Sequence, residues 1–377
     1  MAHIPVLPVG CINQAQPSRI ISGLIVGALA LLITARSREA HAGSLDPLHP
    51  EGLAVAEEQV VPPSCTSFSY PVALAPGQPA DHEIAAELCV PAASTRDTVL
   101  LTVHGATYSS VYWDFPYQPE KYSFVRHANA AGYATLNFDR LGNGGSDRPL
   151  SLQVTPTAQA YAHHQLVEAL RSGELGHAWS RVVLAGHSLG SIIGIQQAAT
   201  YHDVDGLVIT GFLHTYGPGI AVLLANLYPS ALDPRFAPLG LDLGYLTTQP
   251  GARGPTFYYL PNADPAVIAL DEQTKELGTA GELAEFAVVA TALTSLQVDV
   301  PVLSVVGRYD TIFCGVAACG SLLGGTTLEP VAYAPAAELE IVVVPQAGHD
   351  LNLQKNAPTT YAAILDWLDE RFPPLGS

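Results

Sequence analysis

A short stretch near the middle of the chain constrains the fold more than any other: residues 181–191 read R-V-V-L-A-G-H-S-L-G-S. The valine-rich run Arg181–Ala185 predicts a buried parallel strand, and residues 192–201 predict a helix. Between them stands G-x-S-x-G, whose flanking glycines would let strand and helix approach closely while Ser188 occupies a strained turn. The N-terminal N–H groups of the helix would favour a developing oxyanion beside the serine hydroxyl. The stretch therefore predicts a nucleophile elbow.

This motif in its strand–turn–helix context resembles the α/β-hydrolase family, and the resemblance extends from about Thr98 to Phe372. It implies an α/β fold with a mostly parallel sheet, helices on both faces and an inserted helical cap. Segments that predict strands alternate along the chain with segments that predict helices, which agrees with that fold. Strands are predicted at residues 66–74, 82–90, 98–103, 133–138, 181–185, 206–210, 302–306 and 339–344.

The alternation of strands and helices stops at residue 213 and resumes at residue 298. We therefore assign residues 65–213 and 298–377 to the hydrolase core, and residues 214–297 to a strand-free cap or lid above the sheet. The segment 214–297 is rich in Leu, Ala, Pro and Tyr and carries three basic residues, Arg235, Arg253 and Lys275. It predicts an apolar pocket, although a dimer contact or a simple covering for the sheet is the alternative.

The start of the chain resembles a secretory signal. Residues 20–34 are an apolar run of fifteen residues, shorter than the roughly 20 that a membrane span needs. Ala40-His41-Ala42 then offers an A-x-A cleavage site, so residues 1–42 are predicted to be a signal peptide and residues 43–64 a loosely held leader. We expect a secreted protein with no stable membrane span after cleavage. An uncleaved anchor is the alternative.

The net charge restricts the partners. It is −18 for the whole chain, and removing residues 1–42 leaves 13 basic and 33 acidic residues, a net charge of −20. Such a surface repels the phosphates of nucleic acids, so no nucleic-acid partner is expected.

Four cysteines follow the predicted signal: Cys65, Cys89, Cys314 and Cys319. An even number in a secreted chain indicates two disulfides, and four cysteines allow three pairings. Of these we favour the local one, Cys65–Cys89 and Cys314–Cys319. A zinc site is the alternative, but C-x4-C without a matched second pair is a poor ligand pattern.

The resemblance also implies a catalytic triad in the order Ser, acid, His, each on a loop after a strand. Asp310 follows the strand P-V-L-S-V-V and occupies the place of the acid, and His349 follows I-V-V-V-P and occupies the place of the base. Asp139, in a glycine-rich turn after another strand, is the alternative acid. His187, which precedes Ser188, is predicted to be a packing residue. Asp350, which follows His349, is predicted to cap its own loop.

Two backbone N–H groups are expected to form an oxyanion hole, those of Leu189, after the nucleophile, and of Ala106, after the family's His-Gly turn at residues 104–105. Thr107 or Tyr108 is a candidate for an additional hydroxyl. Three aromatic residues in the following loop are predicted to line or roof the substrate pocket, with a role in the core as the alternative. They are Trp113, Phe115 and Tyr117.

Together these features predict a secreted serine hydrolase that cleaves carboxylic esters or lactones of apolar small molecules through an acyl-enzyme intermediate. The resemblance implies neither a metal nor an organic cofactor. A peptidase or an acyltransferase would use the same triad. A ligand-binding or receptor protein that retains the fold without turnover belongs to a different class and also stays open.

Overall fold

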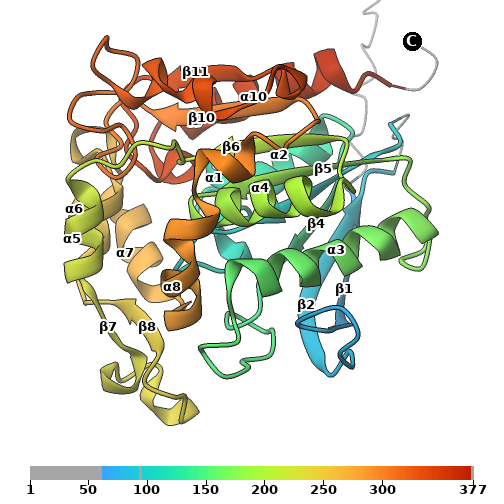
Figure 1. The fold of residues 1–377 in the computed structure, drawn as a ribbon, viewed down its shortest axis with the longest axis horizontal. Coiled ribbons are helices and arrows are strands. Elements are labelled where there is room, and N and C mark those ends of the chain that lie inside the picture. Colours follow the sequence, from blue (N-terminus) through green and yellow to red (C-terminus); the bar gives the residue numbers. More distant parts are fainter. Residues whose placement is uncertain (1–61, 93–95, 375–377) are drawn as a thin grey trace, which may run out of the picture. The chain divides into compact units, whose positions relative to one another are not determined.

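An eight-stranded sheet forms the centre of residues 62–92 and 96–374, which are the residues that the computed structural model describes. The strand order is β1-β2-β4-β3-β5-β6-β10-β11 (Figure 1). β2 pairs antiparallel with β1 and β4, and all other neighbours are parallel. The strands are β1 (Ser64–Val72), β2 (His82–Val90), β3 (Thr98–Val103), β4 (Ala134–Phe138), β5 (Arg181–His187), β6 (Gly206–Thr210), β10 (Val302–Gly307) and β11 (Glu340–Val344).

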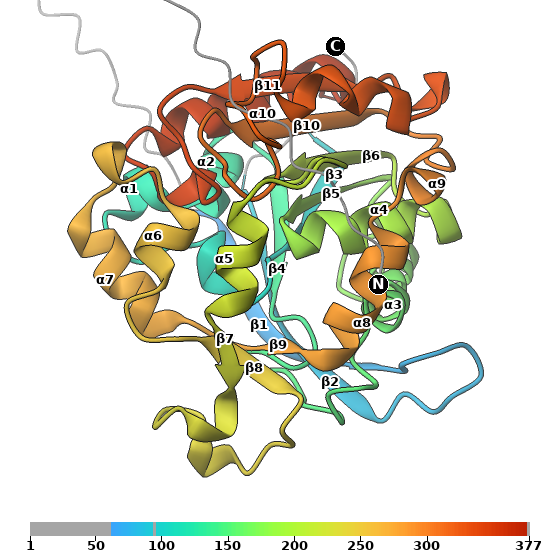
Figure 2. The same cartoon turned by 60° about the vertical axis from the view of Figure 1, so that its left-hand side comes forward.

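Helices cover both faces of this sheet, as the predicted fold class requires. Every residue of β3, β4, β6 and β10 is buried, which explains why these strands are continuous apolar runs without alternation. α3 and α4 pack together on one face, and α1, α2 and α10 pack together on the other (Figures 1 and 2). The helices are α1 (Pro119–Tyr122), α2 (Phe124–Ala130), α3 (Pro156–Ser172), α4 (Leu189–Tyr201) and α10 (Ala357–Arg371).

Residues 214–297 leave the sheet after β6 and return to it at β10. α5 to α8, β7 and β8 lie on the left of Figure 1, whereas α9 lies beside α4 in Figure 2. The helices are α5 (Gly219–Ala225), α6 (Arg253–Phe257), α7 (Pro265–Thr274), α8 (Ala280–Val289) and α9 (Ala292–Ser295). They accompany a small antiparallel sheet of β7 (Leu227–Pro229), β8 (Tyr245–Thr248) and β9 (Gly278–Thr279). The expectation of a strand-free segment is therefore wrong, because strands of two to four residues are too short to show an alternating pattern.

Short 3-10 helices complete the described residues, most of them in segment 214–297 and in the connection from β10 to β11. They are η1 (Ser110–Tyr112), η2 (Ser230–Leu232), η3 (Ala237–Leu239), η4 (Leu260–Asn262), η5 (Gly325–Thr327), η6 (Glu329–Ala332), η7 (Pro335–Ala337) and η8 (Leu351–Leu353). No helix in this part of the chain combines the length and apolar character needed to cross a bilayer. The predicted signal peptide and nearly all of the predicted leader lie outside the described residues.

The four cysteines form the disulfides Cys65–Cys89 and Cys314–Cys319, which is the local pairing predicted from the sequence. Cys65 and Cys89 are directly opposite each other in β1 and β2, so this bond ties the edge strand to the sheet. Within the described ranges, the one cluster with metal-ligand spacing is Cys65, Glu87 and Cys89, and both of its sulfurs belong to this disulfide.

Candidate active site

Ser188 occupies the sharp turn between β5 and α4 that the sequence predicted. Its backbone has φ 52° and ψ −116°, a conformation that side-chain-bearing residues rarely adopt. The backbone around the turn is packed too closely for a residue larger than glycine at positions 186 and 190. A Cβ on Gly186 would lie 2.5 Å from the carbonyl oxygen of Gly190, and one on Gly190 would lie 2.2 Å from that of Val103. These two glycines therefore permit the strained serine.

His349 and Asp310 form a buried hydrogen-bonded pair, with 2.9 Å between His349 Nδ1 and Asp310 Oδ2. Asp310 follows β10 and His349 follows β11, so both lie at the same edge of the sheet as Ser188 after β5. The other Asp310 oxygen accepts the amides of Ile312 (2.8 Å) and Phe313 (3.2 Å), which fixes the carboxylate. Burial alone would lower the pKa of His349, but the Asp310 carboxylate raises it above the usual histidine value.

The Ser188 hydroxyl and the His349 ring make no hydrogen bond with each other in this structure. Both residues nevertheless lie close to residues 210–211 and to Phe313. The Ser188 amide donates to the carbonyl oxygen of Thr210 (2.8 Å). A Cβ on the next residue, Gly211, would lie 3.2 Å from His349 Cε1. The ring of Phe313, which lines the same cavity as Ser188, has its centroid 5.7 Å from that of His349. Catalytic hydrogen bonds are often long without substrate and tighten when it binds.

The proposed oxyanion donors both border the cavity beside Ser188. Ala106 and Leu189 line it together with the serine. In residues 62–92 and 96–374, no carbonyl or side chain accepts a hydrogen bond from either amide, so both are available. The Thr107 amide is occupied, because it donates to the Leu277 carbonyl oxygen (3.0 Å). The Tyr108 hydroxyl donates to Asp350 and does not line the cavity.

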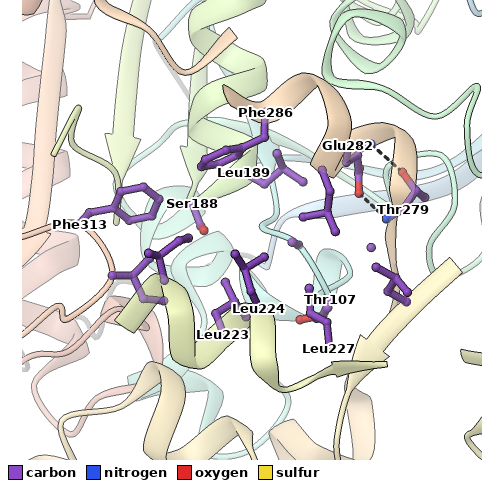
Figure 3. A pocket seen from close by; sticks show the side chains of 16 residues that line it. Thr107, Ser188, Leu189, Leu223, Leu224, Leu227, Thr279, Glu282, Phe286 and Phe313 are labelled. Carbon is purple, nitrogen blue, oxygen red and sulfur yellow. Dashed lines mark hydrogen bonds between the residues drawn. The ribbon is translucent and has the colours of Figure 1, made fainter. Parts of the chain in front are cut away.

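The cavity beside Ser188 has a volume of about 190 Å³ and is lined almost entirely by apolar side chains (Figure 3). Most of them come from segment 214–297, with Ile312 and Phe313 from the loop that follows Asp310. Its lining residues are Ala106, Thr107, Ser188, Leu189, Ile220, Leu223, Leu224, Leu227, Leu246, Gly278, Thr279, Glu282, Leu283, Phe286, Ile312 and Phe313. Figure 3 shows Ser188 at one end of the cavity and Glu282 with Thr279 at the other.

No basic side chain lines this cavity. Each of the three cations of segment 214–297 is instead paired with a carboxylate of the same segment. The nitrogen–oxygen distances are 3.0 Å for Arg235–Glu276, 2.8 Å for Arg253–Asp271 and 2.8 Å for Lys275–Asp233. The single carboxylate in the wall, Glu282, pairs with the buried Arg140. The cavity therefore presents an apolar surface with its one charge neutralised.

Comparisons with known proteins agree with this geometry. The sequence model described as "Alpha/beta hydrolase family" matches residues 100–364. The chain belongs to the α/β-hydrolase family. Among solved structures, it is similar to a monoglyceride lipase from Saccharomyces cerevisiae, at 17% identity over 83% of this chain and 97% of the lipase, with a TM-score of 0.57. A carboxyl esterase from Bacillus coagulans gives 15% identity over 82% and 99% of the two chains, with a TM-score of 0.58.

An enol-lactonase from Burkholderia xenovorans LB400 is also similar, at 15% identity over 76% of this chain and 96% of the lactonase, with a TM-score of 0.51. At these identities the likeness supports the fold alone. A comparison of the sequence with curated proteins finds no match.

The three aromatic residues predicted to line the pocket of this α/β hydrolase lie elsewhere. Trp113 and Phe115 are fully buried and pack edge-on against Phe124 and Tyr122, while Tyr117 stacks on Tyr122. None of the three borders the cavity beside Ser188. The pocket assignment is therefore corrected to a core role. The cause is that η1 and α1 turn this loop toward α2, whereas segment 214–297 fills the space above the serine.

Asp139, the alternative acid, supports the glycine-rich turn of the α/β hydrolase. Its two oxygens accept the amides of Ser110 and Gly145, each at 2.8 Å, and it makes no contact with His349. The side chain of Asp350 is fully buried and makes no capping hydrogen bond to its own loop, so that expectation is wrong. His187 packs as predicted, stacked on Tyr112 with ring centroids 4.1 Å apart.

Two buried arginines to which the sequence analysis gave no role in the site hold the loop carrying Ala106. Arg140 donates to the carbonyl oxygens of His104 (3.0 Å) and Gly105 (3.2 Å). Arg253, from α6, donates to the Thr107 carbonyl oxygen at 3.3 Å. The one sequence signal for Arg140 is its place directly after Asp139, in the glycine-rich turn D-R-L-G-N-G-G. Arg253 had none, because its carbonyl partner is 146 residues away in the sequence.

Proposed function

We propose that this protein is a secreted serine hydrolase that cleaves carboxylic esters or lactones of apolar substrates through an acyl-enzyme intermediate. One observation carries the proposal. Ser188 on its strained turn and the hydrogen-bonded pair His349–Asp310 lie at one edge of the sheet, beside an apolar cavity. Nucleophilic catalysis needs a hydroxyl, a base and a group that orients the base, and these three residues supply them.

In the proposed reaction, Ser188 Oγ attacks the substrate carbonyl carbon while its proton passes to His349 Nε2. Asp310 holds the ring through Nδ1 and stabilises the imidazolium that forms. The amides of Ala106 and Leu189 would donate to the oxyanion, each contributing about 3 kcal/mol to transition-state stabilisation. The His349 proton then leaves with the alcohol. A water molecule, deprotonated by His349, attacks the acyl-enzyme, and release of the acid restores Ser188.

The apolar lining supports ester and lactone substrates with an apolar acyl portion. Residues 214–297 supply Ile220, Leu223, Leu224, Leu227, Leu246, Leu283 and Phe286 to the cavity. We infer that this segment is the cap of the core formed by residues 65–213 and 298–377. A cavity of about 190 Å³ is somewhat larger than the roughly 150 Å³ engineered cavity that accepts benzene, so it fits a short acyl chain or a single ring.

Labelling with a fluorophosphonate tests the nucleophile directly. The wild-type protein is expected to form one covalent adduct on Ser188, located by peptide mass spectrometry, and to hydrolyse p-nitrophenyl butyrate. Ser188→Ala should lose the adduct and more than about 10⁴-fold of the activity while keeping its circular dichroism spectrum. If folded Ser188→Ala hydrolyses the ester at a rate within about tenfold of the wild-type rate, Ser188 is not the nucleophile. A wild-type protein without adduct or turnover would indicate a ligand-binding member of the family.

Secretion is a separate part of the proposal, supported by the two disulfides and by the apolar run at residues 20–34. Expression with residues 1–42 in place should release protein that begins at Gly43, as N-terminal sequencing of the medium would show. Protein retained in membranes with residues 1–42 intact would favour an uncleaved anchor.

A further inference from the structure

One carboxylate lies in the wall of the apolar cavity, at the end opposite Ser188 (Figure 3). It belongs to Glu282, near the start of α8, whose side chain is almost completely buried. Of the described residues that border the cavity, Glu282 alone has an ionisable side chain. Burying a polar group costs free energy unless the group is hydrogen-bonded, so a carboxylate in this position requires partners. The acyl-transfer reaction proposed above does not use Glu282.

The hydrogen bonds of Glu282 leave one acceptor position open. A carboxylate has about four lone-pair sites, two on each oxygen. Oε1 accepts from Arg140 Nη1 and from Gln159 Nε2 (3.3 Å). Within the described ranges, Oε2 accepts only from the Thr279 amide (3.0 Å). Because Glu282 borders the cavity, a donor bound in the cavity can fill the remaining position on Oε2.

A space beside Oε2 is kept open by Gly278, which also borders the cavity. A Cβ on this glycine would lie 3.8 Å from Oε2 of Glu282, and the next nearest atoms would be Thr107 Cγ2 at 3.9 Å and Ala106 Cβ at 4.0 Å. All three are ordinary van der Waals distances, so the space holds one more heavy atom. The Thr107 hydroxyl instead lies against Arg253, whose Nη1 donates to it (3.1 Å). Oε2 is therefore the polar atom among the three that adjoin this space.

The charge on Glu282 is balanced, which restricts the kind of donor that fits. Arg140 is fully buried and pairs with Glu282, and the two side chains together are neutral. A cation would have to leave water for a site without net negative charge, and a buried charge without a matched partner is costly. An anion would meet a lone pair instead of a donor. A neutral hydroxyl fits, because it supplies one proton to one open acceptor position.

We propose that Glu282 Oε2 accepts a hydrogen bond from a hydroxyl group on the acyl portion of the substrate, so that the preferred substrates are esters and lactones of hydroxy acids. The inference rests on the proposed function, which places the substrate carbonyl at Ser188 and the acyl chain in the cavity. The apolar walls bind the methylenes between the two ends. Opening of a lactone produces the same group, since the leaving oxygen stays attached to the acyl chain as a hydroxyl.

Isosteric pairs of ethyl esters test this preference. The acyl chain of each pair ends in either a hydroxyl or a methyl group: 5-hydroxypentanoate with hexanoate, 6-hydroxyhexanoate with heptanoate, and 7-hydroxyheptanoate with octanoate. A purely apolar cavity disfavours the hydroxy ester, because its hydroxyl loses hydrogen bonds to water. With Glu282 as acceptor, kcat/KM measured in a pH-stat should be roughly tenfold higher for the hydroxy ester of the length that spans the cavity, since hydrogen bonds to charged groups are strong.

The variant Gly278→Ala removes the space beside Oε2 and leaves Glu282, Arg140 and the proposed triad in place. Its new methyl group makes no close contact, so the variant should fold. It should lower the hydroxy-to-methyl ratio of kcat/KM by about tenfold or more, because the hydroxyl no longer reaches its acceptor. Leu223→Phe is the matched control. It narrows the same cavity from α5, whereas Glu282 lies on α8, and it should change both members of each pair by the same factor.

A ratio below one for all three pairs, or a ratio that Gly278→Ala leaves unchanged, would overturn the inference. So would a preference seen only for 6-hydroxyhexyl acetate over heptyl acetate, because the hydroxyl would then belong to the alcohol portion. Calorimetry with Ser188→Ala measures the preference without turnover, and the hydroxy ester of the preferred pair should bind about tenfold more tightly than its partner. This binding is expected even if fluorophosphonate labelling refutes the nucleophile, so the two failures are distinguishable.

Discussion

Arg140 and Arg253 are arginines without solvent exposure, and both donate to the carbonyl oxygens of residues 104–107. A buried guanidinium requires fixed acceptors and a paired carboxylate, which Glu282 and Asp271 provide. The loop carrying Ala106 is therefore anchored on both sides by charge-assisted hydrogen bonds. Such anchoring keeps the proposed oxyanion donor aligned before substrate arrives, which is the condition for electrostatic catalysis.

The choice between two candidate acids is also decided at the level of single residues. We expect Asp310→Asn to lower kcat by about 10⁴-fold with little change in KM, because an amide favours the wrong tautomer of His349. Asp139→Asn should leave kcat within about tenfold and reduce stability, since Asp139 accepts two backbone amides in a turn. Steady-state kinetics and thermal melts on both variants check this. The reverse ranking would exchange the two roles.

The pH dependence should follow the ionisation of His349. The base must be neutral to accept the serine proton, so kcat/KM should rise with pH and level off above the pKa of His349. Because Asp310 raises that pKa, the midpoint should lie above the usual histidine value of about 6.5. In Asp310→Asn the carboxylate that raises the pKa of His349 is gone, so burial lowers this pKa. The midpoint of the residual activity should therefore fall to lower pH. A wild-type midpoint well below 6 would contradict the pairing.

The loop from Asp310 to Cys319, called the acid loop below, carries the proposed catalytic acid. It begins at Asp310, and the Cys314–Cys319 disulfide closes it, with the Cys314 amide donating to the Asp310 carbonyl oxygen (3.2 Å). We expect Cys314→Ala/Cys319→Ala to lose several-fold in kcat, because the loop that fixes the carboxylate becomes less restricted. The loss of stability should be about 2 kcal/mol, since the closed loop is short. Kinetics and urea denaturation measure the two effects separately.

Cys65→Ala/Cys89→Ala is the control for this prediction. Its disulfide joins residues 24 apart in the two strands at the edge of the sheet, so its removal should cost more, about 3 kcal/mol. Since β1 and β2 do not border the cavity, kcat should stay unchanged at temperatures where the protein is folded. A larger effect on kcat from this pair than from Cys314 and Cys319 would contradict the idea that the second disulfide supports the acid loop.

At the scale of the whole molecule, the cavity between segment 214–297 and the sheet should set substrate preference. Each buried methylene contributes about 0.8 kcal/mol, or roughly fourfold in kcat/KM. We expect kcat/KM for p-nitrophenyl esters to rise from acetate through the short acyl chains and to level off before decanoate, when about 190 Å³ is filled. A flat or falling series from acetate onward would remove the apolar-pocket interpretation.

A variant of the cavity wall sharpens this test. Leu246 lines the cavity from β8, whereas Leu243 lies three residues earlier and is 73% exposed. Leu246→Trp should move the optimum to shorter acyl chains, because the larger ring occupies part of the volume. Leu243→Trp should leave the series unchanged. The same effect from both substitutions would mean that segment 214–297 influences substrates in some way other than by lining the pocket.

The sequence by itself determined the local features of this protein. Apolar runs predicted the central strands β3, β4, β5, β6 and β10, since a strand covered on both faces must be apolar throughout. The elbow around Ser188 was readable because its glycines and its strained serine are neighbours in the chain. The positions of Asp310 and His349 followed from the family order and from the strands that precede them.

Only the tertiary structure decided what depends on contacts between distant residues. It brought the Asp310 and His349 side chains to 2.9 Å, buried Trp113 and Phe115 in the core, and lined the cavity with residues of segment 214–297. It also set Arg253 and Asp350 among buried carboxyl and hydroxyl groups. An isolated arginine or aspartate looks the same in a sequence whether it is solvated or buried, because its environment comes from partners more than a hundred residues away.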